Sequence, residues 1–126
     1  MKHHEYIDNI KKIIEQIEEK CSESIEESAK IFSRTLLNER KIFLFGTGHS
    51  HMLSEELFYR AGGLLNIQPI LIDELMLHIS ASESTVKERE EGLAEKIFTQ
   101  YKITKDDTIV IISNSGRNGV VVDMAL

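Results

Sequence analysis

Apolar residues in the first third of the chain recur every three or four positions, from Ile7 to Leu36, and glutamate and lysine fill the other faces. This spacing predicts an amphipathic helix over about residues 4–37. So small a domain cannot cover so long a stripe by itself, and two interpretations stay open. The stripe belongs either to a core helix that breaks near Cys21-Ser22, or to a helix that also contacts a second copy of the chain. Cys21 lies on the stripe and is interpreted as a small core residue.

Beyond this helix the pattern changes to short apolar runs of strand length, at residues 41–45, 68–72 and 108–112. The runs lack polar alternation, which is typical of strands covered on both faces in a parallel sheet. Helices are predicted between and after them, over residues 51–61, 84–101 and from 118 to 126. This order of helices and strands favours an α/β fold with a three-layer parallel sheet, preceded by the long helix.

The predicted sheet places the strand at 41–45 in the middle, between the other two. In a doubly wound sheet the loops after the first strand and after its neighbour on the far side then meet at a switch point. Pro69 falls at the start of its strand, where a proline is tolerated. Three strands are few for such a sheet, and the third would have an open edge. We therefore expect residues 1–38 to form a helical segment with a dimer contact, and residues 39–126 the first half of an incomplete domain.

The charge balance narrows the partners. Twenty-one acidic residues against fifteen basic ones give a net charge of -6, which disfavours nucleic acid and anionic lipid and requires any anion to be held locally. The single cysteine excludes an intrachain disulfide, and no apolar run has the length of a membrane span. We expect a cytoplasmic protein that contacts neither nucleic acid nor membrane.

The first candidate site is the loop Gly46-Thr47-Gly48-His49-Ser50, which joins a predicted strand to a predicted helix. Its glycines let the backbone turn sharply and let an anion approach the amides. Ser50 can donate its hydroxyl to the same anion and is expected to be the helix N-cap. The dinucleotide fingerprint needs a third glycine where His51 stands, and the nucleotide P-loop needs a lysine that is absent. No cofactor is expected.

A second loop of similar chemistry, Ser113-Asn114-Ser115-Gly116-Arg117-Asn118, follows the third predicted strand. It offers two hydroxyls, a glycine that frees the backbone, and Asn118 as a helix cap. Two such loops at one crevice are hard to explain as turns alone. Together they predict a phosphate site at the carboxyl ends of the strands.

The residues Gly46–Ser50 followed by Ser113–Gly116 are similar to the signature of the sugar isomerase (SIS) domain family. The segments Leu75–His78, Glu88–Ala94 and Ile112–Asn118 resemble the uncharacterised SIS-domain proteins related to phosphoheptose isomerase, over about the first half of the family's domain. The resemblance implies a flavodoxin-like parallel sheet and a homodimer or homotetramer. It also implies a phosphosugar ligand, either for an isomerase or lyase or for a non-catalytic sensing module.

Carried over by position, the resemblance implies phosphosugar contacts from residues of both loops. These are Gly46, Gly48, His49, Ser50, Ser113, Asn114, Ser115, Gly116 and Asn118. Close relatives tend to carry proline where this chain has Gly119, which removes a pre-set helix start.

Isomerisation needs a base that moves a proton between carbons and an acid that opens the ring. Glu55 and Glu56, on the helix after the first loop, are the candidate bases, and a solvated pair is the alternative. Phosphoheptose isomerases place their glutamate about one turn further along, where this chain has Phe58, Tyr59 and Arg60, so that role does not carry over.

Histidines supply the other candidates. His51 is a candidate acid or base, and His49 or His51 could donate to the ligand. The pair lacks a third ligand at zinc spacing, so no metal is expected. His78, after the second strand, points into the crevice or is a structural histidine. Arg117 either pairs with the ligand or lies at a subunit interface.

Overall fold

The protein is described here by a computed structural model that covers residues 2–126. The chain divides into two compact units, Met1–Arg34 and Thr35–Leu126. Each unit is described by itself.

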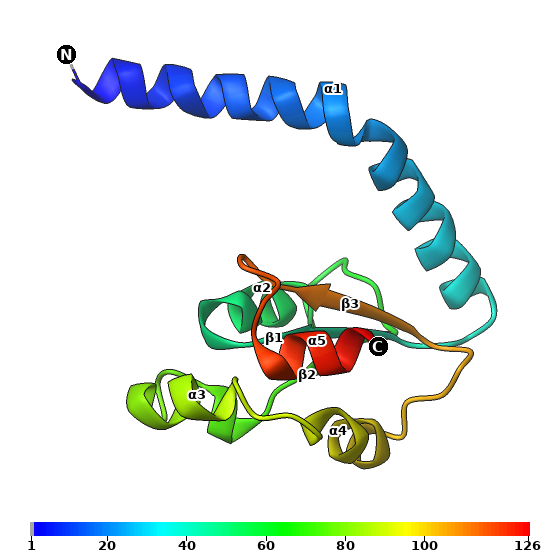
Figure 1. Ribbon diagram of the computed structural model, residues 1–126. Helices are drawn as coiled ribbons and strands as arrows, with labels where there is room; N and C mark the ends of the chain where they lie inside the picture. Colours follow the sequence, from blue (N-terminus) through cyan, green and yellow to red (C-terminus); the bar gives the residue numbers. More distant parts are fainter. Residues whose placement is uncertain (1) are drawn as a thin grey trace. The chain divides into compact units, whose positions relative to one another are not determined.

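The described residues of the first unit belong to helix α1, Lys2–Leu37, which runs without interruption over 36 residues. The interpretation of two helices with a break near Cys21-Ser22 is therefore wrong. The ribbon instead bends near its middle (Figure 1). Along α1 the Ser22 hydroxyl donates to the Glu18 carbonyl, and the Ser28 hydroxyl donates to the Ser24 carbonyl at 2.8 Å. Serine bonds of this kind to the preceding turn often bend helices.

The apolar stripe of α1 is exposed along this unit, as a single helix has nothing of its own to cover it. Ile13 is 55 % exposed, Ile14 59 % and Ile17 46 %. Cys21 is exposed as well, so the expectation that it is a core residue is wrong.

The second unit is built on a three-stranded parallel sheet of β1 (Ile42–Gly46), β2 (Ile67–Ile70) and β3 (Thr108–Ile112). The strand order is β2-β1-β3, with both pairings parallel. The predicted α/β fold with the first strand in the middle is thus confirmed. This order is that of part of a flavodoxin-like sheet.

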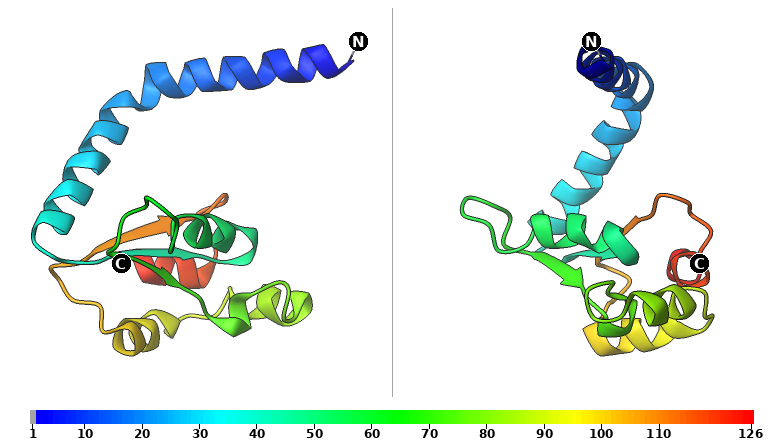
Figure 2. Two further views of the ribbon diagram at one scale, coloured as in Figure 1. Left: turned by 180° about the vertical axis from the view of Figure 1, so that it is seen from behind. Right: turned by 90° about the vertical axis from the view of Figure 1, so that its left-hand side faces the viewer.

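Helices cover the two faces of the sheet (Figure 2). Phe43 and Phe45 of β1 belong to one core cluster with α4 (Leu93–Tyr101) and α5 (Gly119–Ala125). Helix α2 (His51–Glu56) lies against the opposite face, with contacts to β1 and β2. All five residues of β1 are buried, whereas β3 is only half-buried along its length. Within the described residues β3 pairs only with β1, so its outer edge is open as predicted.

The predicted helix over 84–101 is wrong in one respect, because the structure has two helices there. Helix α3 spans Ala81–Lys87, and a loop separates it from α4. Gly92 ends that loop in the left-handed conformation, with φ 80°. The Asp123 carboxylate accepts hydrogen bonds from the backbone N–H of Gly92 at 2.9 Å and of Ala94 at 3.1 Å. A side chain on α5 therefore caps the start of α4.

Two smaller differences concern the first half of the unit. Helix α2 ends at Glu56 rather than at residue 61, and Tyr59 and Gly62 follow with φ of 53° and 75°. Pro69 is the third of the four residues of β2 rather than near its start, because the strand begins at Ile67. It is tolerated because β2 is an edge strand of the described sheet.

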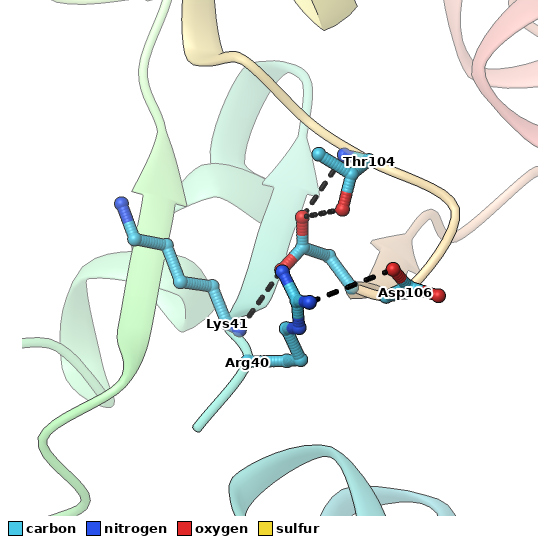
Figure 3. A network of polar contacts seen from close by, with 5 residues as sticks. Arg40, Lys41, Thr104 and Asp106 are labelled. Atoms are coloured by element: carbon cyan, nitrogen blue, oxygen red, sulfur yellow. Dashed lines mark hydrogen bonds and ion pairs between the residues drawn. The ribbon is translucent and has the colours of Figure 1, made fainter. Parts of the chain in front are cut away.

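At the amino ends of β1 and β3 the structure forms a polar clamp around Asp107 (Figure 3). The Asp107 carboxylate accepts from the Lys41 N–H at 3.0 Å, and from the Thr104 N–H and hydroxyl at 2.9 and 2.8 Å. Burial raises the Asp107 pKa, but these bonds and the nearby Arg40 charge outweigh it and hold the pKa below its ordinary value. Asp106 lies 3.7 Å from the guanidinium of Arg40. The clamp sets where the two strands begin.

None of the described helices combines the length and the apolar character needed to cross a membrane.

Candidate functional site

The two glycine- and serine-containing loops leave neighbouring strands at the same edge of the sheet. Gly46, the last residue of β1, pairs in register with Ile112, the last residue of β3. Thr47 and Ser113 therefore start side by side, and both loops lie at this edge (Figure 1). The topology brings together two segments more than sixty residues apart, as predicted for a switch point.

The first loop requires glycine at Gly46. A Cβ atom there would lie 2.8 Å from the Ser50 carbonyl carbon and 2.9 Å from the Ser50 Cβ. Gly48 takes up the left-handed conformation with φ 54° and begins a 3-10 turn, η1 (Gly48–Ser50). Because the chain is already in this turn, Ser50 has helical angles and caps nothing with its side chain. The prediction of Ser50 as an N-cap is wrong, and Thr47 precedes the helical run instead.

The second loop is shaped by its own serines. The Ser113 hydroxyl oxygen accepts from the Gly116 N–H at 3.0 Å, and that of Ser115 accepts from the Arg117 N–H at 3.4 Å. Gly116 allows the turn with φ 62°. In both bonds the hydroxyl is the acceptor, so its own proton is left to donate. Asn114, Ser115, Gly116 and Arg117 are all exposed.

Helix α5 begins at the end of this loop in an unexpected way. Asn118 occupies the N-cap position, but its side chain makes no capping bond. The Val120 N–H donates instead to the Glu88 carbonyl at 3.2 Å. At Gly119 a Cβ atom would lie 2.6 Å from the Arg89 carbonyl oxygen. The glycine thus lets the α3–α4 loop approach the helix start, which explains why a side chain such as proline does not fit here.

Of the three candidate catalytic residues, the structure brings His51 and Glu55 together and leaves Glu56 apart. The His51 ring is buried; its Nδ1 donates to the Gly48 carbonyl, and its Nε2 lies 3.0 Å from Oε1 of Glu55. Glu56, the next residue, pairs instead with Arg60 on the exposed side of the helix. His51 and Glu55 therefore lie together beneath the first loop, and Glu56 does not join them.

A hollow of about 370 Å³ adjoins this pair. It is lined by His49, His51, Met52, Glu55, Leu77 and His78. His78 is exposed, with its ring centroid 5.9 Å from that of His51, so it is a surface residue of the hollow rather than a buried structural histidine. Leu77 approaches the first loop, its Cδ1 atom being 3.9 Å from the position of a Cβ on Gly48. Sequence reasoning missed Leu77 and Met52, because apolar residues in a turn and on a helix carry no chemical signal.

A larger hollow, of about 440 Å³, lies beside α3. Its one cation, Lys87, is already bound by Glu90 at 2.9 Å and by Glu74 at 3.4 Å. The bonds to Glu90 and Glu74 raise the Lys87 pKa. The acidic side chains around it do not suit an anionic ligand. Among residues 2–126 no group of three metal-binding side chains is found either.

Residues 5–126 match the SIS domain. The chain belongs to the SIS domain family. The resemblance noted from the two loops is thereby confirmed.

Relatives of this SIS domain include three UPF0309 proteins. The one from Thermoanaerobacter pseudethanolicus is 45 % identical over 124 residues, which is 97 % of this chain and 50 % of the relative. That from Caldanaerobacter subterraneus is 46 % identical over 122 residues, with 96 % and 50 % covered. That from Listeria monocytogenes is 41 % identical over 120 residues, with 95 % and 49 % covered. The chain spans about half the length of these relatives.

Proposed function

We propose that this SIS domain binds a phosphorylated sugar, with the phosphate held between Gly46–Ser50 and Ser113–Asn118. The observation that carries the proposal is the register of Gly46 with Ile112, because it sets the two loops side by side. The hydroxyls of Ser50, Ser113 and Ser115 donate to the phosphate. The backbone around Gly48 and Gly116 approaches it closely.

The other residues of the two loops also lie around the ligand in this proposal. Gly46 lets the first loop fold back on itself, and His49, which is exposed beside the hollow, faces the sugar. Asn114 and Asn118 border the phosphate on the second loop. Well-formed hydrogen bonds to a charged group are worth about 1.5–3 kcal/mol each, enough to hold an anion on an acidic protein. No metal and no nucleotide takes part.

The full-length protein acts on this ligand as a phosphosugar isomerase or related lyase. Glu55 is the carboxylate that borders the hollow. The alternative is a module that senses a phosphosugar without converting it. One observation favours that alternative: Glu56 is paired with Arg60, and both ring nitrogens of His51 have partners, which leaves few free acid–base groups.

The partner of the α1 stripe is proposed to be a second copy of the chain, in a cytoplasmic homodimer or homotetramer. A second identical stripe would cover the exposed Ile14 and Ile17 side chains. Light scattering of the full-length protein should give a dimer or larger at micromolar concentration. A stable monomer would contradict the proposal.

Calorimetric titration of the full-length protein tests the phosphate site. Hexose and heptose phosphates should bind, whereas the unphosphorylated sugars should bind far more weakly. Ser50→Ala and Ser115→Ala should each weaken binding by roughly tenfold, or about 1.4 kcal/mol. Ser82→Ala, at an exposed serine of α3, is the matched control and should change nothing. Equal affinity for free and phosphorylated sugars would refute the site.

A further inference from the structure

We infer that a chain of contacts from Glu55 through His51 to Gly48 fixes the first loop in the conformation that receives the phosphate. His51 and Glu55 are then positioning residues, which act on the ligand through the loop backbone. This inference rests on the phosphate site proposed above and assigns a role to two residues within it.

The first step concerns the His51 ring. Its side chain is buried, 6 % exposed as a residue, so its nitrogens must find partners inside the protein. A carbonyl oxygen can only accept, so Nδ1 carries the proton in the bond to Gly48. Nε2 lies 3.0 Å from Oε1 of Glu55; because a carboxylate only accepts, this ion pair forms when Nε2 carries a proton as well. With both nitrogens engaged, the ring has no nitrogen left for a ligand.

The second step concerns the residue that the ring holds. Gly48 has φ 54°, and a Cβ there would meet only Leu77, at 3.9 Å, so packing restrains it little. Glycine has more backbone freedom than any other residue. Two bonds restrain its carbonyl: one from the His51 ring and one from the His51 backbone N–H. The ring therefore adds a restraint that loop packing does not supply.

The third step concerns the contrast between two neighbouring glutamates. Glu55 and Glu56 stand side by side on α2 and are both exposed, but only Glu55 reaches His51. Glu56 binds Arg60, four residues further along the chain. Glu56 is therefore a matched control: it has the same chemistry, lies on the same helix and is likewise exposed, without the contact to the loop.

Substitutions at His51 separate a positioning role from a merely structural one. In His51→Asn the side-chain amide nitrogen lies close to where Nδ1 was and can still donate to the Gly48 carbonyl. In His51→Ala no donor remains. At position 55, Glu55→Gln keeps an acceptor for Nε2, whereas Glu55→Ala removes it. Each position thus has one variant that keeps a polar partner for the contact and one that removes it.

The experiment is calorimetric titration of the full-length variants with inorganic phosphate and, separately, with a hexose phosphate. His51→Ala should weaken both ligands by about tenfold, and Glu55→Ala by about threefold. Glu55→Gln and Glu56→Gln should stay within about twofold of the parent protein. His51→Asn keeps the donor to Gly48 but loses the contact with Glu55, so it should weaken binding by no more than the roughly threefold of Glu55→Ala. Thermal melting of each variant shows that it is folded. If His51→Ala does not fold, the comparison of Glu55→Ala with Glu55→Gln, at an exposed side chain, gives the answer.

The inference is overturned if His51→Ala binds phosphate as the parent does, or if His51→Asn binds as weakly as His51→Ala. The serine variants tell which statement has failed. If Ser50→Ala and Ser115→Ala weaken binding while His51→Ala does not, the phosphate site stands and the positioning role is wrong. If none of these variants changes phosphate affinity, the site itself is wrong, and the positioning role with it.

Discussion

The two ends of β1 and β3 carry opposite kinds of polar chemistry. At the amino ends the Asp107 carboxylate accepts three hydrogen bonds from Lys41 and Thr104, and Arg40 lies nearby (Figure 3). At the carboxyl ends the hydroxyls of Ser113 and Ser115 accept one bond each and keep a proton to donate. The polar groups at the amino ends are therefore bonded to one another, whereas the hydroxyls at the carboxyl ends still have protons to donate to a ligand.

This difference indicates which end of such a sheet can bind an anionic ligand. A saturated network stabilises the start of the strands and has nothing to offer a ligand. Loops with unused donors gain little stability from them, but they can bind an anion that supplies acceptors. Stability should therefore respond most to changes at the amino end, and affinity to changes at the carboxyl end, except where a glycine is needed sterically.

The largest expected effect on stability is at Gly46, where a side chain does not fit. Gly46→Ala would force a Cβ against the backbone of Ser50 at 2.8 Å. We expect a loss of about 3 kcal/mol in the free energy of unfolding, as for an overpacked core site. Urea denaturation measures it. Gly62→Ala is the control: it has φ 75° but nothing within 4 Å, and should cost only about 1 kcal/mol. Equal losses at both sites would contradict the steric argument.

The second-largest effect on stability is expected at the polar clamp around Asp107. Asp107→Ala should lower the free energy of unfolding by about 2 kcal/mol, because the N–H groups of Lys41 and Thr104 lose a charged acceptor. The Asp107 pKa is lowered in the folded protein. Its contribution is therefore fully present above the ordinary aspartate pKa, and it is lost as the pH falls through the lower folded value.

Denaturation curves at pH 7 and in the acidic range check this prediction. The parent protein and Asp107→Ala should converge in stability as the carboxyl is protonated. Asp106→Ala serves as the control, because its contact with Arg40 is long at 3.7 Å and exposed, worth at most a few tenths of a kcal/mol. If both variants lose the same stability, the clamp does not act as described.

The smallest effect on stability is expected at the carboxyl end. Ser113→Ala removes one acceptor from the Gly116 N–H in a solvent-exposed turn and should cost about 0.5 kcal/mol. Its effect on phosphosugar affinity should be several times larger in free energy. Melting and titration of the same sample compare the two. A large stability loss without an affinity loss would reverse the contrast between the two ends.

The helix break at 88–92 shows the kind of feature that sequence reasoning could not supply. The apolar spacing of residues 84–101 fits one helix, and Gly92 alone does not rule it out. What separates α3 from α4 is Asp123, which caps α4 from a position 31 residues after Gly92. The same holds for Gly119: a side chain does not fit at this position because the Arg89 carbonyl lies too close. Neither partner can be identified from local sequence.

The sequence by itself determined the parallel sheet, its strand order and the family, because unbroken apolar runs and glycine–serine loops are signals that can be recognised locally in the chain. It also indicated Glu55, Glu56 and His51 together as candidates. Only the tertiary structure decided between them: Glu55 and His51 share a contact, while Glu56 turns to Arg60. The physical reason is that neighbouring residues on a helix point in different directions, so identical side chains meet different partners.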